Sequence, residues 1–65
     1  MKDLGKTIAK YRKEHKLNQS QLAKELENYD IYVKQNSIST WELGTATPNA
    51  RQFLVLCEIL EIYDI

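Results

Sequence analysis

The chain lacks the marks of several protein classes. Its single cysteine, Cys57, has no second cysteine with which to form an internal disulfide, and a lone thiol without a cluster of histidines cannot build a zinc site. Its longest apolar run, residues 53–57, is far shorter than the roughly 18 residues that a membrane-spanning helix needs. Residues 1–16 are too polar for a secretory signal. We therefore expect no metal ion, no membrane partner and a reducing, cytoplasmic compartment.

Glycine and proline are scarce as well, with two glycines and one proline among 65 residues. Together with 43% hydrophobic residues, this composition argues against a β-sandwich, a low-complexity segment or a disordered tail. A chain of this length holds one small domain, residues 1–65, with a marginal core. We expect an all-α domain. The C-terminal run EIYDI has no polar tail, which favours a piece of a longer protein.

A net charge is also missing, which argues against a nucleic-acid binder until the charges are placed along the chain. Residues 1–24 carry seven bases and two acids, a net of +5, and residues 25–65 carry two bases and seven acids, a net of −5. Such asymmetry fits a molecule of which one side meets an anion. Two solvated faces of different charge explain it equally well.

Four stretches have the residue pattern of helices: about 3–16, 19–26, 34–43 and 48–61, with an extended connection at residues 27–33. Asn18, with Gln21 three residues later, forms a capping-box pattern at the start of the second helix. Gly44 stands where a glycine commonly ends a helix. We expect Thr47 to cap the fourth helix, with Pro48 as its first residue.

The core is predicted from apolar residues at helical spacing. The fourth helix is apolar around most of its circumference, so a further element or another chain is expected to cover it. Trp41 lies three residues after Ile38 and is expected in the core rather than as a stacking platform. The predicted core residues are Leu4, Ile8, Leu22, Ala23, Leu26, Ile38, Trp41, Phe53, Leu56, Cys57 and Leu60.

The stretch VKQNSISTWELG, residues 33–44, combines helical spacing with short uncharged polar side chains. The amides of Gln and Asn match the N6 and N7 edge of adenine in the major groove, whereas Ser, Thr and Asn are weak helix formers. A helix face built from such weak helix formers is more easily explained by a role in base recognition than by a role in stability. Two alternatives stay open: a helix start capped by Asn36 or Ser37, and a merely solvated face at Ser39 and Thr40.

The run LNQSQLAKEL, residues 17–26, followed by SISTWELGTATPNARQFLVLCEIL, residues 37–60, resembles the lambda-type repressor and Cro (Xre-type) helix-turn-helix family. The likeness extends over residues 4–62. It implies a small lambda-repressor-like bundle of four to five short helices, in which the second and third form the helix-turn-helix. The chain departs from that family in the eleven residues between Leu26 and Ile38, which imply a lengthened turn, and in the missing fifth helix.

The resemblance also implies roles for single residues. Arg12 and Glu42 match a pair that joins the first helix to the end of the third, although an exposed pair worth at most about 1 kcal/mol is the alternative. The lysines are either phosphate contacts or ordinary solubilising charges. We expect base contacts from Gln35, Asn36, Ser39 and Thr40, and phosphate contacts from Asn18, Gln19, Lys34, Ser37 and Lys10.

The function that these patterns favour is the sequence-specific DNA-binding domain of a bacterial or phage transcriptional regulator of repressor type, associated with the nucleoid. Residues 34–43 are expected to lie in the major groove of double-stranded DNA, at a palindromic operator bound by a homodimer. The dimer is expected to form through residues beyond 65 or through the apolar C-terminal helix. The alternative is a helix-turn-helix module that binds a protein, such as an antitoxin or antirepressor-type partner.

Catalysis is not expected. Ser37 and Ser39 have His15 as their one candidate base, and no glycine-rich elbow, phosphate loop or pair of carboxylates accompanies them. We therefore expect neither enzymatic activity nor a cofactor.

Overall fold

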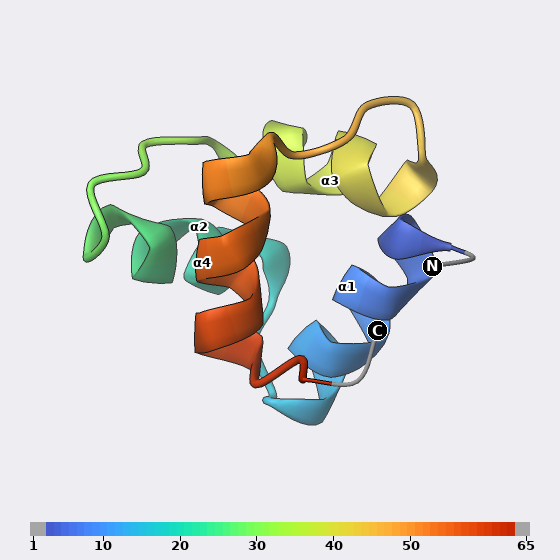
Figure 1. The fold of residues 1–65 in the computed structure, drawn as a ribbon, viewed down its shortest axis with the longest axis horizontal. Helices are drawn as coiled ribbons and strands as arrows, with labels where there is room; N and C mark the ends of the chain where they lie inside the picture. Colours follow the sequence, from blue (N-terminus) through green and yellow to red (C-terminus); the bar gives the residue numbers. More distant parts are fainter. Residues whose placement is uncertain (1–2, 64–65) are drawn as a thin grey trace.

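The computed structural model describes residues 3–63, which form four helices and no strand. The helices are α1 (Leu4–Glu14), α2 (Gln19–Glu27), α3 (Gln35–Leu43) and α4 (Ala50–Leu60). α3 packs against α1 and α2, and α4 stands upright across the same two helices (Figure 1). The all-α bundle with a lengthened turn is therefore confirmed. Among residues 3–63, no helix is long and apolar enough to cross a membrane.

The first two helices begin at side-chain caps. Asp3 Oδ1 accepts a hydrogen bond from the backbone N–H of Lys6 at 3.0 Å. The capping box of α2 is confirmed, because Asn18 and Gln21 each accept from the other's backbone N–H at 2.7 Å. α1 ends at Glu14, two residues earlier than expected, since Lys16 adopts a left-handed φ of 59° that turns the chain towards α2.

The predicted start of α4 is wrong. Asn49 is its N-cap, and Asn49 and Gln52 accept from each other's backbone N–H at 2.8 Å. Thr47 and Pro48 precede the helix. The reason is local: a reciprocal box satisfies two donors of the first turn, whereas a cap at Thr47 would have Ala50 at the third helical position, and alanine cannot reciprocate.

The connection between α2 and α3 makes a turn at residues 28–30 and then runs extended over residues 31–34. Its Ile31 side chain is buried in the core and its Val33 side chain packs against the core. Its Tyr29 carbonyl accepts a hydrogen bond from Arg51 Nη2 at 2.9 Å. Lys34 is the N-cap of α3 and forms no side-chain capping bond. The alternative in which Asn36 or Ser37 caps this helix is therefore wrong.

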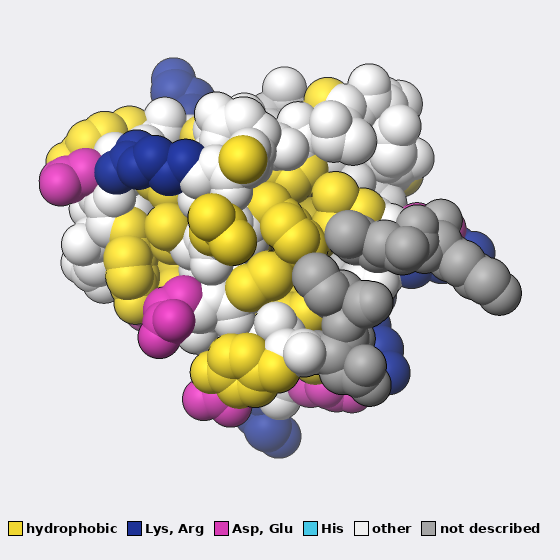
Figure 2. Space-filling view, in the orientation of Figure 1, with side chains coloured by type: hydrophobic (Ala, Val, Ile, Leu, Met, Phe, Trp, Pro, Cys, Tyr) yellow, Lys and Arg dark blue, Asp and Glu magenta, His cyan; other side chains and the backbone are white. Residues whose placement is uncertain are grey.

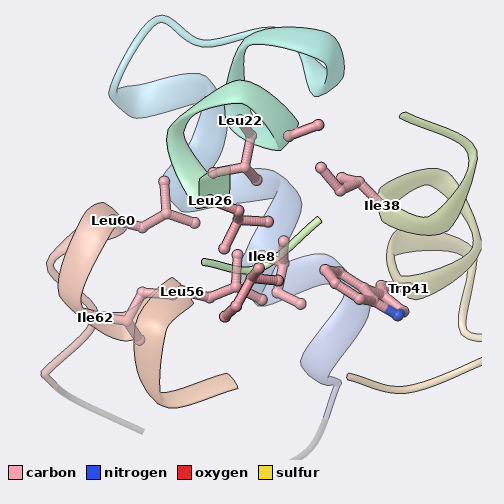
Figure 3. Close-up of a cluster of buried hydrophobic side chains, with 10 residues drawn as sticks. Ile8, Leu22, Leu26, Ile38, Trp41, Leu56, Leu60 and Ile62 are labelled. Carbon is pink, nitrogen blue, oxygen red and sulfur yellow. The ribbon is translucent and has the colours of Figure 1, made fainter. Parts of the chain in front are cut away.

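The core lies where α1, α2, α3 and the inner face of α4 meet (Figure 3). Its buried side chains are Ile8, Leu22, Ala23, Leu26, Ile31, Ile38, Trp41, Leu56, Leu60 and Ile62. Ile31 and Ile62 are members that the sequence pattern did not predict.

Three predicted core residues need correction. Leu4 and Cys57 are only partly buried and pack against the edge of the core, and Phe53 is partly buried outside it. The physical reason is that α1 and α2 cover a single stripe of α4, Leu56 and Leu60, and leave its flanks at the surface. Within residues 3–63, α4 therefore keeps an exposed face, with Leu54 68% exposed.

Two glycines fix the position of α3. A Cβ on Gly5 of α1 would lie 2.4 Å from the Glu42 carbonyl oxygen and 2.6 Å from that of Trp41, so α1 and α3 meet backbone to backbone. Gly44 has a φ of 84° and ends α3 in the left-handed conformation that glycine adopts without strain.

Candidate nucleic-acid interface

α3 has a buried face and an exposed face, with half-buried residues between them. Ile38 and Trp41 point into the core, whereas Lys34, Gln35 and Asn36 are exposed at its N-terminus. Asn36, Ser39 and Leu43 follow one another at helical spacing on the side opposite the core. This outward face carries no charged side chain.

Leu43 is a candidate that the sequence pattern missed. Its side chain is 75% exposed on the same face as Asn36 and Ser39. Single exposed leucines are common on protein surfaces, so Leu43 is a candidate because of its place on this face and not because it is exposed. Its i+4 relation to Ser39, opposite the apolar positions of the helix, was the signal in the sequence.

The half-buried residues of α3 are partly engaged within the helix. Thr40 Oγ1 donates to the Ser37 carbonyl at 2.7 Å, so this hydroxyl keeps only acceptor capacity for another partner. Ser37 and Ser39 are half-buried as well. Among the four expected base contacts, Gln35 and Asn36 are thus the most accessible.

Gln35 is held by α2. Its Nε2 donates to Gln19 Oε1 at 3.2 Å, and its Oε1 accepts from Ser20 Oγ at 3.4 Å. Gln19, the first residue of α2, in turn donates through Nε2 to Glu42 Oε1 at 3.0 Å. An expected phosphate contact and an expected base contact therefore lie side by side, and both are tied to the end of α3.

Arg12 and Glu42 form a two-pronged ion pair: Nε to Oε2 at 2.6 Å, and Nη2 to Oε1 at 3.1 Å. Arg12 Nη1 also donates to the Leu17 carbonyl at 2.8 Å. Each of the two side chains is only 10% exposed, so the alternative of an exposed, weak pair does not describe them. One of the seven basic residues in residues 1–24, Arg12, is thus engaged in a buried ion pair.

The ion pair shifts the pKa of both Arg12 and Glu42. The hydrogen bond and charge of Glu42 outweigh the burial of Arg12 and raise its pKa. Burial raises the pKa of Glu42, but hydrogen bonds from Arg12 and Gln19 and the charges of Arg12 and Lys13 lower it further, so that the pKa ends below its ordinary value. Glu42 is therefore a carboxylate at neutral pH.

The remaining expected phosphate contacts are spread around this centre. Asn18 Oδ1 is used in the capping box, and Lys34 is exposed at the start of α3. Lys10 is exposed, with its Nζ 5.6 Å from the centroid of the Tyr11 ring. No hydrogen bond or ion pair among the described residues joins Lys10 to α2 or α3.

Comparison with known proteins agrees with this geometry. A helix-turn-helix domain family matches residues 5–63, which span all four helices. No curated protein and no solved structure gives a significant match. The match is consistent with the resemblance to lambda-type repressors and Cro. The chain belongs to the helix-turn-helix domain family.

Proposed function

We propose that this chain is the sequence-specific DNA-binding domain of a bacterial or phage transcriptional repressor, with α3 in the major groove. The observation that carries the proposal is the exposed surface of α3, where Gln35 at the N-terminus adjoins the outward face of Asn36, Ser39 and Leu43, opposite the core. Such a face offers hydrogen-bond donors and acceptors to base edges without attracting every phosphate equally. The domain acts by occupying DNA in the cytoplasm and needs no cofactor or catalytic group.

Base recognition is assigned to the most exposed groups. Gln35 and Asn36 carry amides that pair with adenine through two hydrogen bonds, each pair contributing about 1–3 kcal/mol of discrimination. Ser39 and Thr40 supply weaker polar contacts, and Leu43 offers an apolar contact for a thymine methyl group. α3 therefore reads a short site from its N-terminus towards Leu43.

Phosphate contacts are assigned to groups that flank α3. Gln19 and Asn18 stand at the N-terminus of α2, where backbone N–H groups point outwards, and Lys34 and Ser37 stand at that of α3. Lys10 adds a positive charge from α1. Because few cations take part, affinity should fall only gently with salt.

The domain binds a palindromic operator as a homodimer, and we assign the contact to the uncovered face of α4. Figure 2 shows hydrophobic side chains gathered over this helix, with charged side chains at the margin. Leu54 is 68% exposed there, between Arg51 and Glu58 at helical spacing, and Val55 is half-buried beside it. If a second copy packs its α4 antiparallel, centred on Leu54 and Val55, each Arg51 lies beside the other copy's Glu58. This face of α4 is therefore complementary to itself in charge.

Selection of bound duplexes from a random pool tests the function. The wild-type chain should enrich a palindrome whose half-sites lie about one helical turn apart. Gln35→Ala/Asn36→Ala should keep the helical content and lose the enriched positions under the outward face of α3. Enrichment of no sequence by the wild-type chain would contradict the proposal.

A second candidate function is protein binding by the same architecture, as in an antitoxin or antirepressor. The exposed Leu54 and Leu43 and the zero net charge favour it. Sedimentation with random duplex DNA separates the two functions. A chain that retains no DNA in any oligomeric state, yet binds another protein tightly, has the second function.

A further inference from the structure

The hydrogen bonds around Glu42 have a direction that chemistry dictates. An ionised carboxylate only accepts hydrogen bonds, and Glu42 is held in that form by Arg12. The end of Gln19 that lies 3.0 Å from Glu42 Oε1 must therefore be its NH₂ group. The amide of Gln19 has only one orientation that satisfies this contact.

The orientation of the Gln19 amide in turn fixes that of the Gln35 amide. With its NH₂ turned to Glu42, Gln19 presents its carbonyl Oε1 to Gln35, so Gln35 must present an NH₂ in return, at 3.2 Å. Its Oε1 then faces the hydroxyl of Ser20, which donates at 3.4 Å. Arg12, Glu42, Gln19 and Gln35 thus form one directed chain of hydrogen bonds from the interior to the exposed start of α3.

We propose that Glu42 determines base specificity without touching DNA, because it fixes the donor and acceptor ends of the Gln35 amide through Gln19. This inference rests on the proposed function of α3 and adds a positioning residue to it. Glu42 lies at the far end of the helix from Gln35, and its side chain, only 10% exposed, is bonded to Arg12 and Gln19.

The direction matters because adenine is not symmetrical. Its N7 accepts and its N6 donates, so a glutamine must bring its NH₂ and its carbonyl in the matching order. In Gln35 one N–H is used by Gln19, and the other N–H and a carbonyl lone pair remain for a base. If the Gln35 amide were reversed, its NH₂ group would face the N6 donor of adenine. A Gln35 released from Gln19 is free to adopt either order and so tolerates more bases.

Variants at Gln19 separate the orientation of the Gln35 amide from electrostatic attraction to the DNA phosphates. Gln19→Lys keeps a donor for Glu42 and adds a positive charge, but has no acceptor to orient Gln35. Gln19→Met removes both the donor and the acceptor. The Arg12–Glu42 pair and the Asn18 capping box do not depend on this side chain, so both variants should fold. Lys34→Met is the matched control, since it weakens phosphate attraction without touching the chain of hydrogen bonds.

Glu42 itself is tested with Arg12→Met/Glu42→Met, which removes the acceptor without leaving a buried charge unpaired. Each variant is titrated with the duplex that the wild-type chain selects and with duplexes changed at the base pair that Gln35→Met no longer discriminates. We expect discrimination at that base pair to fall by about fivefold or more in Gln19→Lys, Gln19→Met and the double variant, against none in Lys34→Met. Binding to random duplex should weaken in Gln19→Met but not in Gln19→Lys.

The outcomes are distinct. A wild-type chain that selects no sequence overturns the proposed function. A wild-type chain with a preference that both Gln19 variants retain in full overturns the role of Glu42 and leaves the function standing. In the unbound protein, the side-chain NH₂ resonances of Gln35 should shift in Gln19→Lys, Gln19→Met and Arg12→Met/Glu42→Met. They should stay in place in Lys34→Met. Resonances unchanged by Gln19→Met would also overturn the directed chain.

Discussion

Gly5 of α1 lies directly under the last turn of α3, so closely that a Cβ there would stand 2.4 Å from the backbone oxygen of Glu42. Both contacting groups are backbone, which cannot swing aside as a side chain would. This contact sets how near α3 approaches α1. It therefore also sets the position of Glu42 relative to Arg12.

Gly5→Ala is expected to lower the free energy of unfolding by about 2 kcal/mol or more, as for overpacking of a tight contact. The helix propensity of alanine acts in the opposite direction and does not compensate. Urea unfolding followed by circular dichroism measures the change. Lys6→Ala, an exposed change in the same turn, is the control and should be near neutral. Equal stability of Gly5→Ala and the wild-type chain would show that α1 and α3 are not in backbone contact.

Removal of Arg12 alone should destabilise the fold far more than replacement of both Arg12 and Glu42 by apolar residues. Arg12→Met leaves a carboxylate buried without its cation and should cost about 3–5 kcal/mol, which is most of the stability of a domain of this size. Arg12→Met/Glu42→Met removes both charges and should recover the larger part of that loss. Thermal unfolding of both variants provides the comparison. A double variant no more stable than the single one would mean that the pair itself, and not an unpaired charge, supports the fold.

Acid should weaken the fold through Glu42. Its pKa in the folded chain is lower than the ordinary 4.5, so the unfolded chain takes up the proton first as the pH falls. The stability that the carboxylate contributes is complete above about pH 5 and is lost as the pH drops through the folded pKa. The raised pKa of Arg12 adds no slope in this range, because the contribution of Arg12 is complete at every pH below the ordinary pKa of arginine.

The measurement is unfolding free energy against pH, for the wild-type chain and for Arg12→Met/Glu42→Met. Below about pH 5 the wild-type curve should fall more steeply, because the other carboxylates are common to both chains. Parallel curves would show that Glu42 has the same pKa in the folded and unfolded chains.

Local signals in the sequence predicted much of this fold. The Asn18 and Gln21 box, the left-handed Gly44 and the buried faces of Ile38 and Trp41 were all foreseen, because each depends on residues within about two turns. The start of α4 was missed although its signal is also local. Asn49 with Gln52 forms a complete capping box, whose two reciprocal hydrogen bonds outweigh the preference of Pro48 for the first helical position.

Other features lie beyond sequence patterns because they depend on tertiary contacts. The approach of Gly5 to Glu42 and the bond between Gln19 and Gln35 join different helices, and neither leaves a periodic trace. Ile31 sits in a segment without helical periodicity, so nothing in the pattern marked it as buried. The pairing of Arg12 with Glu42, by contrast, was implied by the family resemblance and not by residue spacing.

The proposed dimer contact on α4 can be tested by exchanging charges. Arg51→Glu and Glu58→Arg each place like charges side by side in the antiparallel pairing and should weaken self-association about tenfold. Arg51→Glu/Glu58→Arg restores opposite charges with their places exchanged, and should dimerise nearly as well as the wild-type chain. Sedimentation equilibrium of the four chains measures this, with Leu54→Ser as a variant expected to abolish association. Glu25→Lys, an exposed change on α2, is the control for altered net charge. Single variants that associate like the wild-type chain, or a double variant that fails to recover, would exclude this pairing and leave any dimer to another surface.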